Sequence, residues 1–154
     1  MKTLIVYYSR TGSCKSLATT ISEAMNSDCE RLLDVHPYRG PLGFLRGCFV
    51  AVRKMLTNIC PPQFQPREYD QVILITPIWV GRAAPAIRNY VDQYSDMCRK
   101  LKLFVVGMKH DTEGRVSDDL QSSFGLNIDN TVLFTSSEIR KGDVLERLKS
   151  MSAK

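Results

Sequence analysis

Short, uninterrupted apolar runs recur along the chain and most constrain how it can fold. The clearest are residues 3–8 (TLIVYY) and 71–76 (QVILIT), and residues 101–106 and 131–135 have the same character. Continuous apolar character predicts strands buried on both faces, because a strand with one face in water alternates between apolar and polar residues. The sequence therefore predicts a parallel sheet with helices covering both of its faces.

Helical periodicity separates these runs. Apolar residues recur at three- and four-residue spacing directly after residues 9–13, and again at 85–94, 116–124 and 144–151, while Pro85 suits the first position of its helix. A weaker strand is expected at residues 30–35. The predicted architecture is a three-layer, doubly wound α/β fold with a five-stranded parallel sheet, and residues 1–154 are expected to form one domain, since a chain of this length usually buries a single core.

The net charge of +5 comes from one segment. Residues 35–67 contain five basic residues and no Asp or Glu, whereas the whole chain has 21 basic and 16 acidic residues. Within residues 36–66, six apolar residues lie on one face of a predicted helix that ends at Pro61 and Pro62: Leu45, Cys48, Phe49, Val52, Leu56 and Ile59. We expect this face to be buried and Arg46, Arg53 and Lys54 to face solvent, either as a solvated surface or as a patch that attracts anionic partners. Five cations are too few for a nucleic-acid-binding tail.

Cysteine and histidine usage limits the chemistry. The five cysteines are scattered and form no close pair, which predicts no zinc or disulfide motif and a reducing, cytoplasmic location. Two histidines, His36 and His110, are too few for a metal site. No apolar stretch approaches the roughly 20 residues that span a bilayer, so neither a membrane span nor a secretory signal is expected.

Three loops should carry the function, because ligands of such sheets lie beyond the carboxyl ends of the strands. These are residues 9–14, 76–82 and 107–114. The first, SRTGSC, places hydroxyls and backbone N–H groups at a helix N-terminus, which favours a phosphate, although Ser13 could simply cap the helix. The glycine patterns of dinucleotide-binding loops and of P-loops are absent. A cysteine phosphatase would require an arginine six residues after Cys14, and this chain has Thr20 there. A receiver domain would require an aspartate at the end of the third strand, where this chain has Thr76.

Two of these loops together resemble the flavodoxin family. Residues 8–18 (YSRTGSCKSLA) resemble the flavodoxin phosphate loop S-x-T-G-N-T with its following alanine. Residues 75–82 (ITPIWVGR), followed by PAIR, resemble the T-P-I/V-W-x-G loop of flavodoxin-like proteins. The resemblance covers essentially the whole chain and implies the strand order 2-1-3-4-5 and an FMN cofactor.

The resemblance also implies roles for individual residues. The hydroxyls of Ser9, Thr11 and Ser13 and the N–H groups of Gly12 through Cys14 would bind the FMN phosphate, with Arg10 adding a cation; Ser13 and Cys14 replace the usual Asn and Thr. The second loop would pack Trp79 on the flavin ring, the alternative being that this single tryptophan is a core residue. The implied cofactor-binding set is Ser9, Arg10, Thr11, Gly12, Ser13, Cys14, Thr76, Pro77, Ile78, Trp79, Val80, Gly81, Gly107, Met108 and Lys109, and no metal is expected.

Two functions and a third alternative follow. The third loop, which begins Gly107-Met108-Lys109, lacks the tyrosine that many flavodoxins stack on the opposite flavin face. An open face would admit a second substrate, as in an enzyme that uses NAD(P)H to reduce a quinone. A one-electron carrier between protein partners is the second hypothesis, and it is disfavoured because typical carrier flavodoxins are acidic whereas this chain is basic. A flavodoxin-fold binding module without FMN is the third hypothesis.

Cys14 has two possible roles. It is either a reactive thiol beside Arg10 and Lys15 or a small residue that fits the loop.

Overall fold

Five parallel strands form the central sheet of the computed structural model, which describes residues 1–108 and 113–152. Their order is β2-β1-β3-β5-β6, as expected when the parallel strands are counted in sequence. A sixth, two-residue strand, β4, pairs antiparallel with the end of β3. The strands are β1 (Thr3–Tyr7), β2 (Asp28–Arg31), β3 (Gln71–Trp79), β4 (Arg82–Ala83), β5 (Leu101–Gly107) and β6 (Asn130–Thr135).

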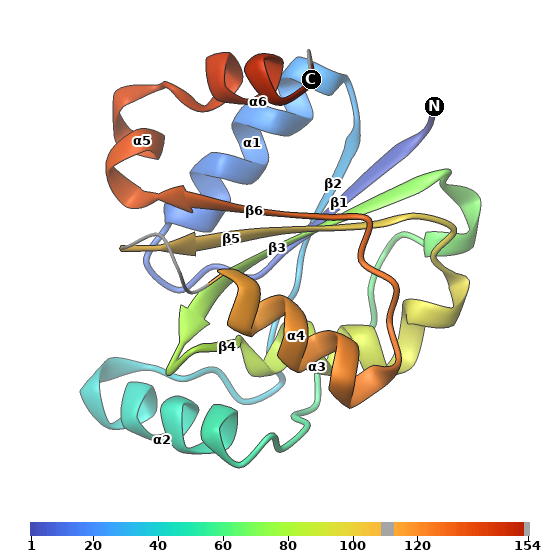
Figure 1. The fold of residues 1–154 in the computed structure, drawn as a ribbon. Helices are drawn as coiled ribbons and strands as arrows, with labels where there is room; N and C mark the ends of the chain where they lie inside the picture. The colour runs from blue at the N-terminus through green and yellow to red at the C-terminus, as the bar shows by residue number, and fades with distance from the viewer. Residues whose placement is uncertain (109–112, 153–154) are drawn as a thin grey trace.

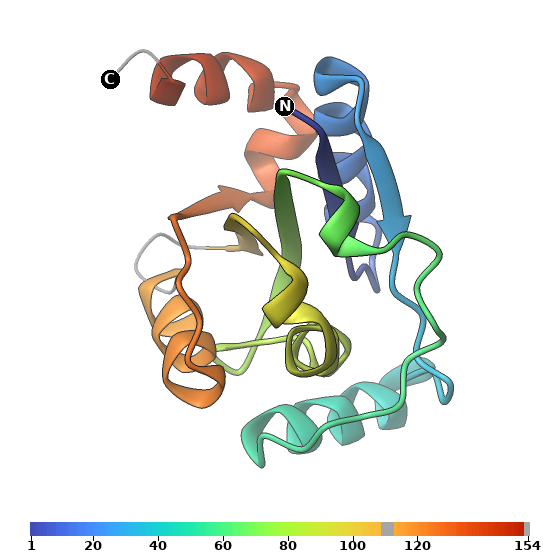
Figure 2. The same ribbon diagram turned by 90° about the vertical axis from the view of Figure 1, so that its right-hand side faces the viewer.

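Helices cover both faces of the sheet (Figure 1). One layer contains α1 (Ser13–Met25), α5 (Ser136–Lys141) and α6 (Val144–Ser152), and the other contains α2 (Gly40–Val52), α3 (Pro85–Tyr94) and α4 (Glu113–Phe124). Two single turns of 3₁₀ helix, η1 (Pro66–Glu68) and η2 (Ser95–Met97), complete the elements. In the two views, α2 lies beyond α3 at the outside of its layer (Figure 2).

The strands pack against both helical layers, which explains their continuous apolar sequences. In β1, Leu4 and Val6 belong to the core on the α3 and α4 side, whereas Ile5 and Tyr7 belong to the core beneath α1. Side chains alternate between the faces of a strand, so a strand with helices on both sides needs apolar residues at every position. The predicted second strand is misplaced: β2 is Asp28–Arg31 rather than residues 30–35.

A hairpin replaces the loop that was predicted at residues 76–82. Strand β3 continues through Pro77 and Ile78 to Trp79 and turns at Val80 and Gly81 into β4. Both turn residues have positive φ, 52° at Val80 and 75° at Gly81, a combination that matches the twist of a two-residue hairpin. The prediction was wrong because residues 76–81 (TPIWVG) include residues typical of turns, and these do not indicate how far the preceding strand continues.

Helix α2 differs from its prediction in both length and orientation. It ends at Val52, well before Pro61, and its buried residues are Gly47, Val50 and Ala51. Four of the six apolar residues expected in the core are exposed: Leu45 63%, Phe49 56%, Val52 47% and Leu56 44%. The other two, Cys48 and Ile59, are partly buried, and Ile59 packs against the core. The small-residue face is buried because it approaches Trp79 so closely that a Cβ on Gly47 would lie 2.5 Å from Trp79 Cζ3.

Asp119 of α4 forms ion pairs with three cations from other parts of the fold. Its carboxylate pairs with Lys54, just after α2, at 2.9 Å, with Arg82 of β4 at 2.5 Å, and with the buried Arg88 of α3. Lys54 faces solvent as expected, with its side chain 45% exposed, and it is paired with Asp119 as well. The cluster fixes the hairpin and the α2 terminus against the α3 and α4 layer.

A returning segment is held beside the edge strand β2 and the chain that follows it. The Glu30 carboxylate accepts hydrogen bonds from the backbone N–H groups of Gln63 and Phe64. Further along, Asp34 and Ile59 form an isolated antiparallel bridge. The chain that follows α2 is thereby held alongside this edge of the sheet.

Candidate functional site

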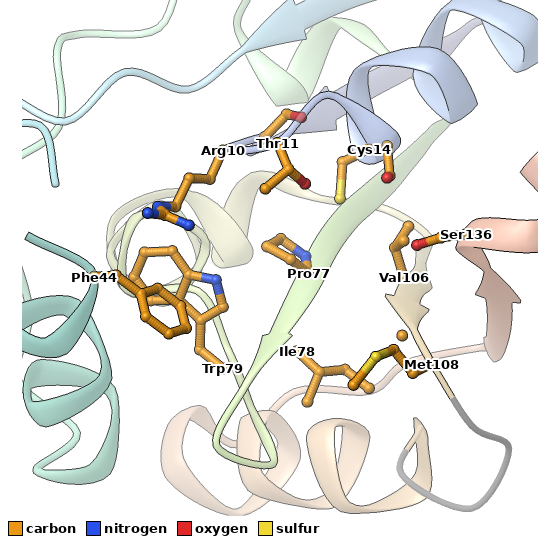
Figure 3. A pocket seen from close by; sticks show the side chains of 13 residues that line it. Arg10, Thr11, Cys14, Phe44, Pro77, Ile78, Trp79, Val106, Met108 and Ser136 are labelled. Carbon is orange, nitrogen blue, oxygen red and sulfur yellow. The ribbon is translucent and has the colours of Figure 1, made fainter. Parts of the chain in front are cut away.

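A cavity of about 490 Å³ opens at the carboxyl ends of β1, β3 and β5. The first loop and the start of α1 form one wall, β3 and the end of β5 form the floor, and Phe44 of α2 and Ser136 of α5 lie at opposite sides (Figure 3). Its volume falls within the range of small-molecule and cofactor sites, about 300–1,000 Å³. The lining residues are Ser9, Arg10, Thr11, Ser13, Cys14, Phe44, Pro77, Ile78, Trp79, Val106, Gly107, Met108 and Ser136.

The polar wall is the N-terminus of α1, which has no side-chain cap. Gly12 is the N-cap, with φ 103° and ψ −20°, and the first turn contains no acidic residue. The first N–H groups of a helix have no partner within the helix and, with the helix dipole, favour an anion. The alternative that Ser13 caps this helix is wrong, because Ser13 is its first residue.

Ser9 shapes the loop that leads into α1. Its Oγ accepts a hydrogen bond from Gly12 N at 3.1 Å, and its carbonyl accepts one from the Arg31 guanidinium at 3.1 Å. The left-handed conformation of Gly12 is accessible to glycine at little cost. The sequence thus forms a tight, cation-braced turn that presents the α1 N–H groups to the cavity.

Arg10 connects this loop to α2. Its guanidinium donates to the carbonyl of Gly40 at 3.4 Å and lies 4.7 Å from the centre of the Phe44 ring. It therefore adds positive charge to the cavity rim while it packs on an aromatic wall. The predicted basic segment does border the cavity, through Phe44.

Trp79 is both a lining residue and a core residue. The side chain is 4% exposed and contacts three aromatic rings edge to face, with centroid distances of 5.7 Å to Tyr8, 5.6 Å to Tyr38 and 6.1 Å to Phe44. Figure 3 shows Trp79 and Phe44 together on the side of the cavity below Arg10. The indole thus holds α2 and β3 together, as well as contributing to the cavity wall.

Cys14 is a buried thiol. Its side chain is 2% exposed, and burial raises its pKa from 9.0 to about 12. Burial outweighs the effect of the helix N-terminus, because a thiolate here would be almost wholly desolvated. Cys14 is therefore a small apolar component of the cavity wall. This agrees with the alternative that it is a small residue that fits the loop, and not with a reactive thiol.

Ten of the fifteen residues implied by the resemblance line this cavity. Of the others, Gly12 sets the turn beneath the first loop, and Val80 and Gly81 form the hairpin turn. Thr76 is fully buried, and its Oγ1 accepts a hydrogen bond from Ala84 N at 3.0 Å, so it holds the hairpin against α3. Lys109 lies outside the described residues.

Three lining residues were missed: Phe44, Val106 and Ser136. Val106 and Ser136 stand at the ends of predicted strands, where the strand-end rule applied to every strand would have found them. Phe44 lies off the apolar stripe used to orient the basic helix, so no sequence signal placed it here.

Other expected features concern metals, cysteines and membranes. Among the described residues, no group of three or more His, Cys, Asp or Glu side chains is placed to hold a metal ion. All five cysteines are free thiols. No helix in the described part of the chain is long and apolar enough to cross a membrane.

Comparisons with known proteins identify the fold. No protein-family model and no curated protein matches the sequence. Among solved structures, a flavoprotein from Lactobacillus acidophilus in complex with FMN is 22% identical, with a TM-score of 0.73 over 91% of this chain and 97% of that one. A candidate flavoprotein from Bacteroides eggerthii is also 22% identical, with a TM-score of 0.75 over 94% and 96% of the two chains.

More distant structures share the same arrangement. A flavodoxin from the domain Archaea gives a TM-score of 0.50 at 14% identity, over 97% of this chain and 99% of that one. An NADH:FMN oxidoreductase gives 0.52 at 14% identity, over 97% and 86%. These likenesses agree with the observed strand order, so the chain has the flavodoxin-like fold.

Proposed function

We propose that this protein binds FMN in the cavity at the strand ends and transfers electrons through it. The observation that carries the proposal is the junction, in one cavity, of the uncapped N-terminus of α1 with an apolar floor. A flavin mononucleotide has a phosphate at one end and a flat, largely apolar ring system at the other. The similar Lactobacillus acidophilus structure is a complex with FMN, which supports the same ligand here.

The residues present fit this cofactor. The α1 N–H groups and the hydroxyls of Ser9, Thr11 and Ser13 would hold the phosphate, and such donors need no paired cation. Pro77, Ile78 and Val106 offer an apolar surface to the ring, with Trp79 and Phe44 at one side (Figure 3). Cys14 adds no charge, because its raised pKa keeps the thiol neutral beside a phosphate.

The proposed chemistry divides between cofactor and protein. When bound, FMN supplies the redox chemistry by accepting hydride from a nicotinamide and passing electrons to an acceptor. The chain binds and orients the cofactor: Ser9 and Gly12 fix the phosphate turn, Arg10 places a cation at its rim, and the aromatic side excludes water.

We favour an NAD(P)H-dependent reductase of a quinone or similar acceptor over a one-electron carrier. On the β5 side, the described cavity wall consists of Val106, Gly107 and Met108, with no aromatic ring. Met108 is 92% exposed. A ring face without an aromatic cover admits a second planar substrate, and the basic net charge of +5 suits an anionic nicotinamide better than the acidic surface of a typical carrier. A binding module without FMN is the remaining alternative.

The test compares FMN with riboflavin, which lacks the phosphate. We expect that less apoprotein is needed to quench the fluorescence of FMN than to quench the fluorescence of riboflavin. Replacing Ser9 and Thr11 together by Ala should weaken FMN on the order of tenfold or more and leave riboflavin nearly unchanged, since hydrogen bonds to a charged group contribute roughly 1.5–3 kcal/mol each. Thr19→Ala, exposed on α1 away from the cavity, is the matched control.

The outcomes separate the three functions. If the double variant loses affinity for FMN and riboflavin equally, this loop does not bind the phosphate. If the wild-type protein binds neither ligand, the result favours a binding module without FMN. If FMN binds, NADPH or NADH oxidation with a quinone acceptor supports the reductase. A holoprotein that exchanges electrons only with a protein partner, and oxidises neither nicotinamide, would be the carrier.

A further inference from the structure

The apolar stripe of α2 points away from the protein. Leu42, Leu45, Phe49 and Val52 repeat at three- and four-residue spacing along one face, with exposed fractions of 81%, 63%, 56% and 47%. Just beyond the helix, Met55 and Leu56 are also exposed, at 50% and 44%. Half of the fourteen large apolar residues that are exposed in the described chain lie between residues 42 and 56. A contiguous exposed apolar surface of this kind marks an interaction site.

The rest of the molecule leaves this surface uncovered. Figures 1 and 2 place α2 at the outside of its layer, with the other elements on one side only. Another face of the helix is already occupied, because Gly47, Val50 and Ala51 are buried and Gly47 lies against the indole of Trp79. The exposed stripe is therefore not the face that attaches α2 to the fold.

Three arginines of the basic segment accompany the stripe. Arg39, Arg46 and Arg53 are exposed, and none of them pairs with a carboxylate in residues 1–108 or 113–152. The guanidinium of Arg53 lies 5.2 Å from the ring centre of Phe49, on the stripe itself. No Asp or Glu occurs from residue 35 to residue 67, so nothing within this segment neutralises these charges.

We propose that this face of α2 docks on an anionic phospholipid bilayer, with the helix lying in the plane of the membrane surface. A helix with an exposed apolar stripe flanked by arginines inserts its apolar side chains at the headgroup boundary, while the cations bind lipid phosphates. Long arginine side chains can reach headgroups while their stems cover apolar surface. The inference goes beyond the proposed function, because docking requires no flavin.

Charge decides between this occupant and a second copy of the chain. Two copies related by a two-fold axis would bring the same stripe and the same arginines together, with no acidic residue in the segment to pair with them. An anionic bilayer supplies the opposite charge along the whole stripe. The surface is therefore complementary to lipid headgroups and not to itself.

The test is co-sedimentation of the full-length protein with lipid vesicles. We expect binding to vesicles of phosphatidylcholine mixed with phosphatidylglycerol, little binding to phosphatidylcholine alone, and weakening as salt rises. Replacing Leu45 and Phe49 by Ser should weaken binding about tenfold or more, and so should replacing Arg46 and Arg53 by Gln. All four side chains are exposed, so these variants should keep the wild-type melting temperature.

Matched controls lie on other elements. Met25→Ser with Met97→Ser removes exposed apolar residues elsewhere, and Arg140→Gln with Lys141→Gln removes exposed cations of α5; both should bind as wild type. The proposal is overturned by equal binding to both kinds of vesicle, by no binding to either, or by stripe variants that bind as well as the controls. Sedimentation analysis that finds a dimer lost in the Leu45 and Phe49 variant would show that a second copy covers the face instead.

Discussion

The backbone of Gly47 rests directly on the indole ring of Trp79. A Cβ at position 47 would lie 2.5 Å from Cζ3 and 3.1 Å from Cη2 of that ring, so only glycine allows the two to approach this closely. The contact determines which face of α2 is buried, and it places the helix beside the cavity.

Substitution of Gly47 should therefore loosen α2. Gly47→Val places two further methyl groups in the indole and should lower the free energy of unfolding by about 1–3 kcal/mol, as overpacking does elsewhere. Urea denaturation measures this. Gly114→Ala is the control, because nothing lies within 4 Å of the added methyl. Because both substitutions improve helix propensity, a Gly47→Val variant as stable as the wild type or more stable would contradict the role of the indole contact.

Trp79→Ala should affect both stability and ligand affinity. Removal of a side chain this buried costs about 3–5 kcal/mol, and loss of an aromatic wall should weaken FMN by up to about tenfold. Phe104→Ala, on the α1 side of the sheet, serves as a control for stability alone. Unchanged FMN affinity in a titration of Trp79→Ala apoprotein would remove Trp79 from the ligand site.

Asp119→Asn should be strongly destabilising. The change leaves Arg88, 2% exposed, without its carboxylate, and breaking a buried ion pair by removing one partner costs about 3–5 kcal/mol. Thermal unfolding should show a large drop in Tm, whereas Asp118→Asn, exposed on the same helix, should change it little. Similar melting of the two variants would contradict the role of this cluster.

Thiol labelling should distinguish Cys14 from the surface cysteine. Burial raises the pKa of Cys14 to about 12, so its reactive thiolate is scarce at neutral pH and becomes abundant only as pH rises toward that value. Iodoacetamide should label the exposed Cys60 first, and Cys14 should remain unlabelled through pH 9 in the folded protein. Rapid labelling of Cys14 at pH 7, detected by mass spectrometry, would show that the first loop opens or that the thiol is activated.

The sequence was most informative where one physical requirement acts alone. A strand buried on both faces must be apolar throughout, so β1, β3 and β5 were predictable, and the strand-end rule then placed Ser9 and Pro77 in one cavity. The short strand β4 was not predictable, because the hairpin depends on Ala84 N–H bonding to Thr76 Oγ1, which only the folded chain brings together.

Helix α2 shows where periodicity fails. Its stripe from Leu45 to Val52 is a regular apolar face, and the rule that such faces are buried assigns it to the core. The chain instead buries the face with Gly47 and Ala51, because close approach to Trp79 requires small side chains. Periodicity locates an apolar face but does not say whether protein, another molecule or solvent lies against it.

The charge on the edge strand β2 has a consequence for association between copies of the sheet. An open strand edge offers unpaired N–H and C=O groups to which a strand from another chain can add. Three of the four residues of β2 are charged, and the Glu30 carboxylate holds the backbone of Gln63 and Phe64 alongside. Strand addition at this edge would set these charged side chains against those of the added strand, so the sheet resists growing into fibres from this side.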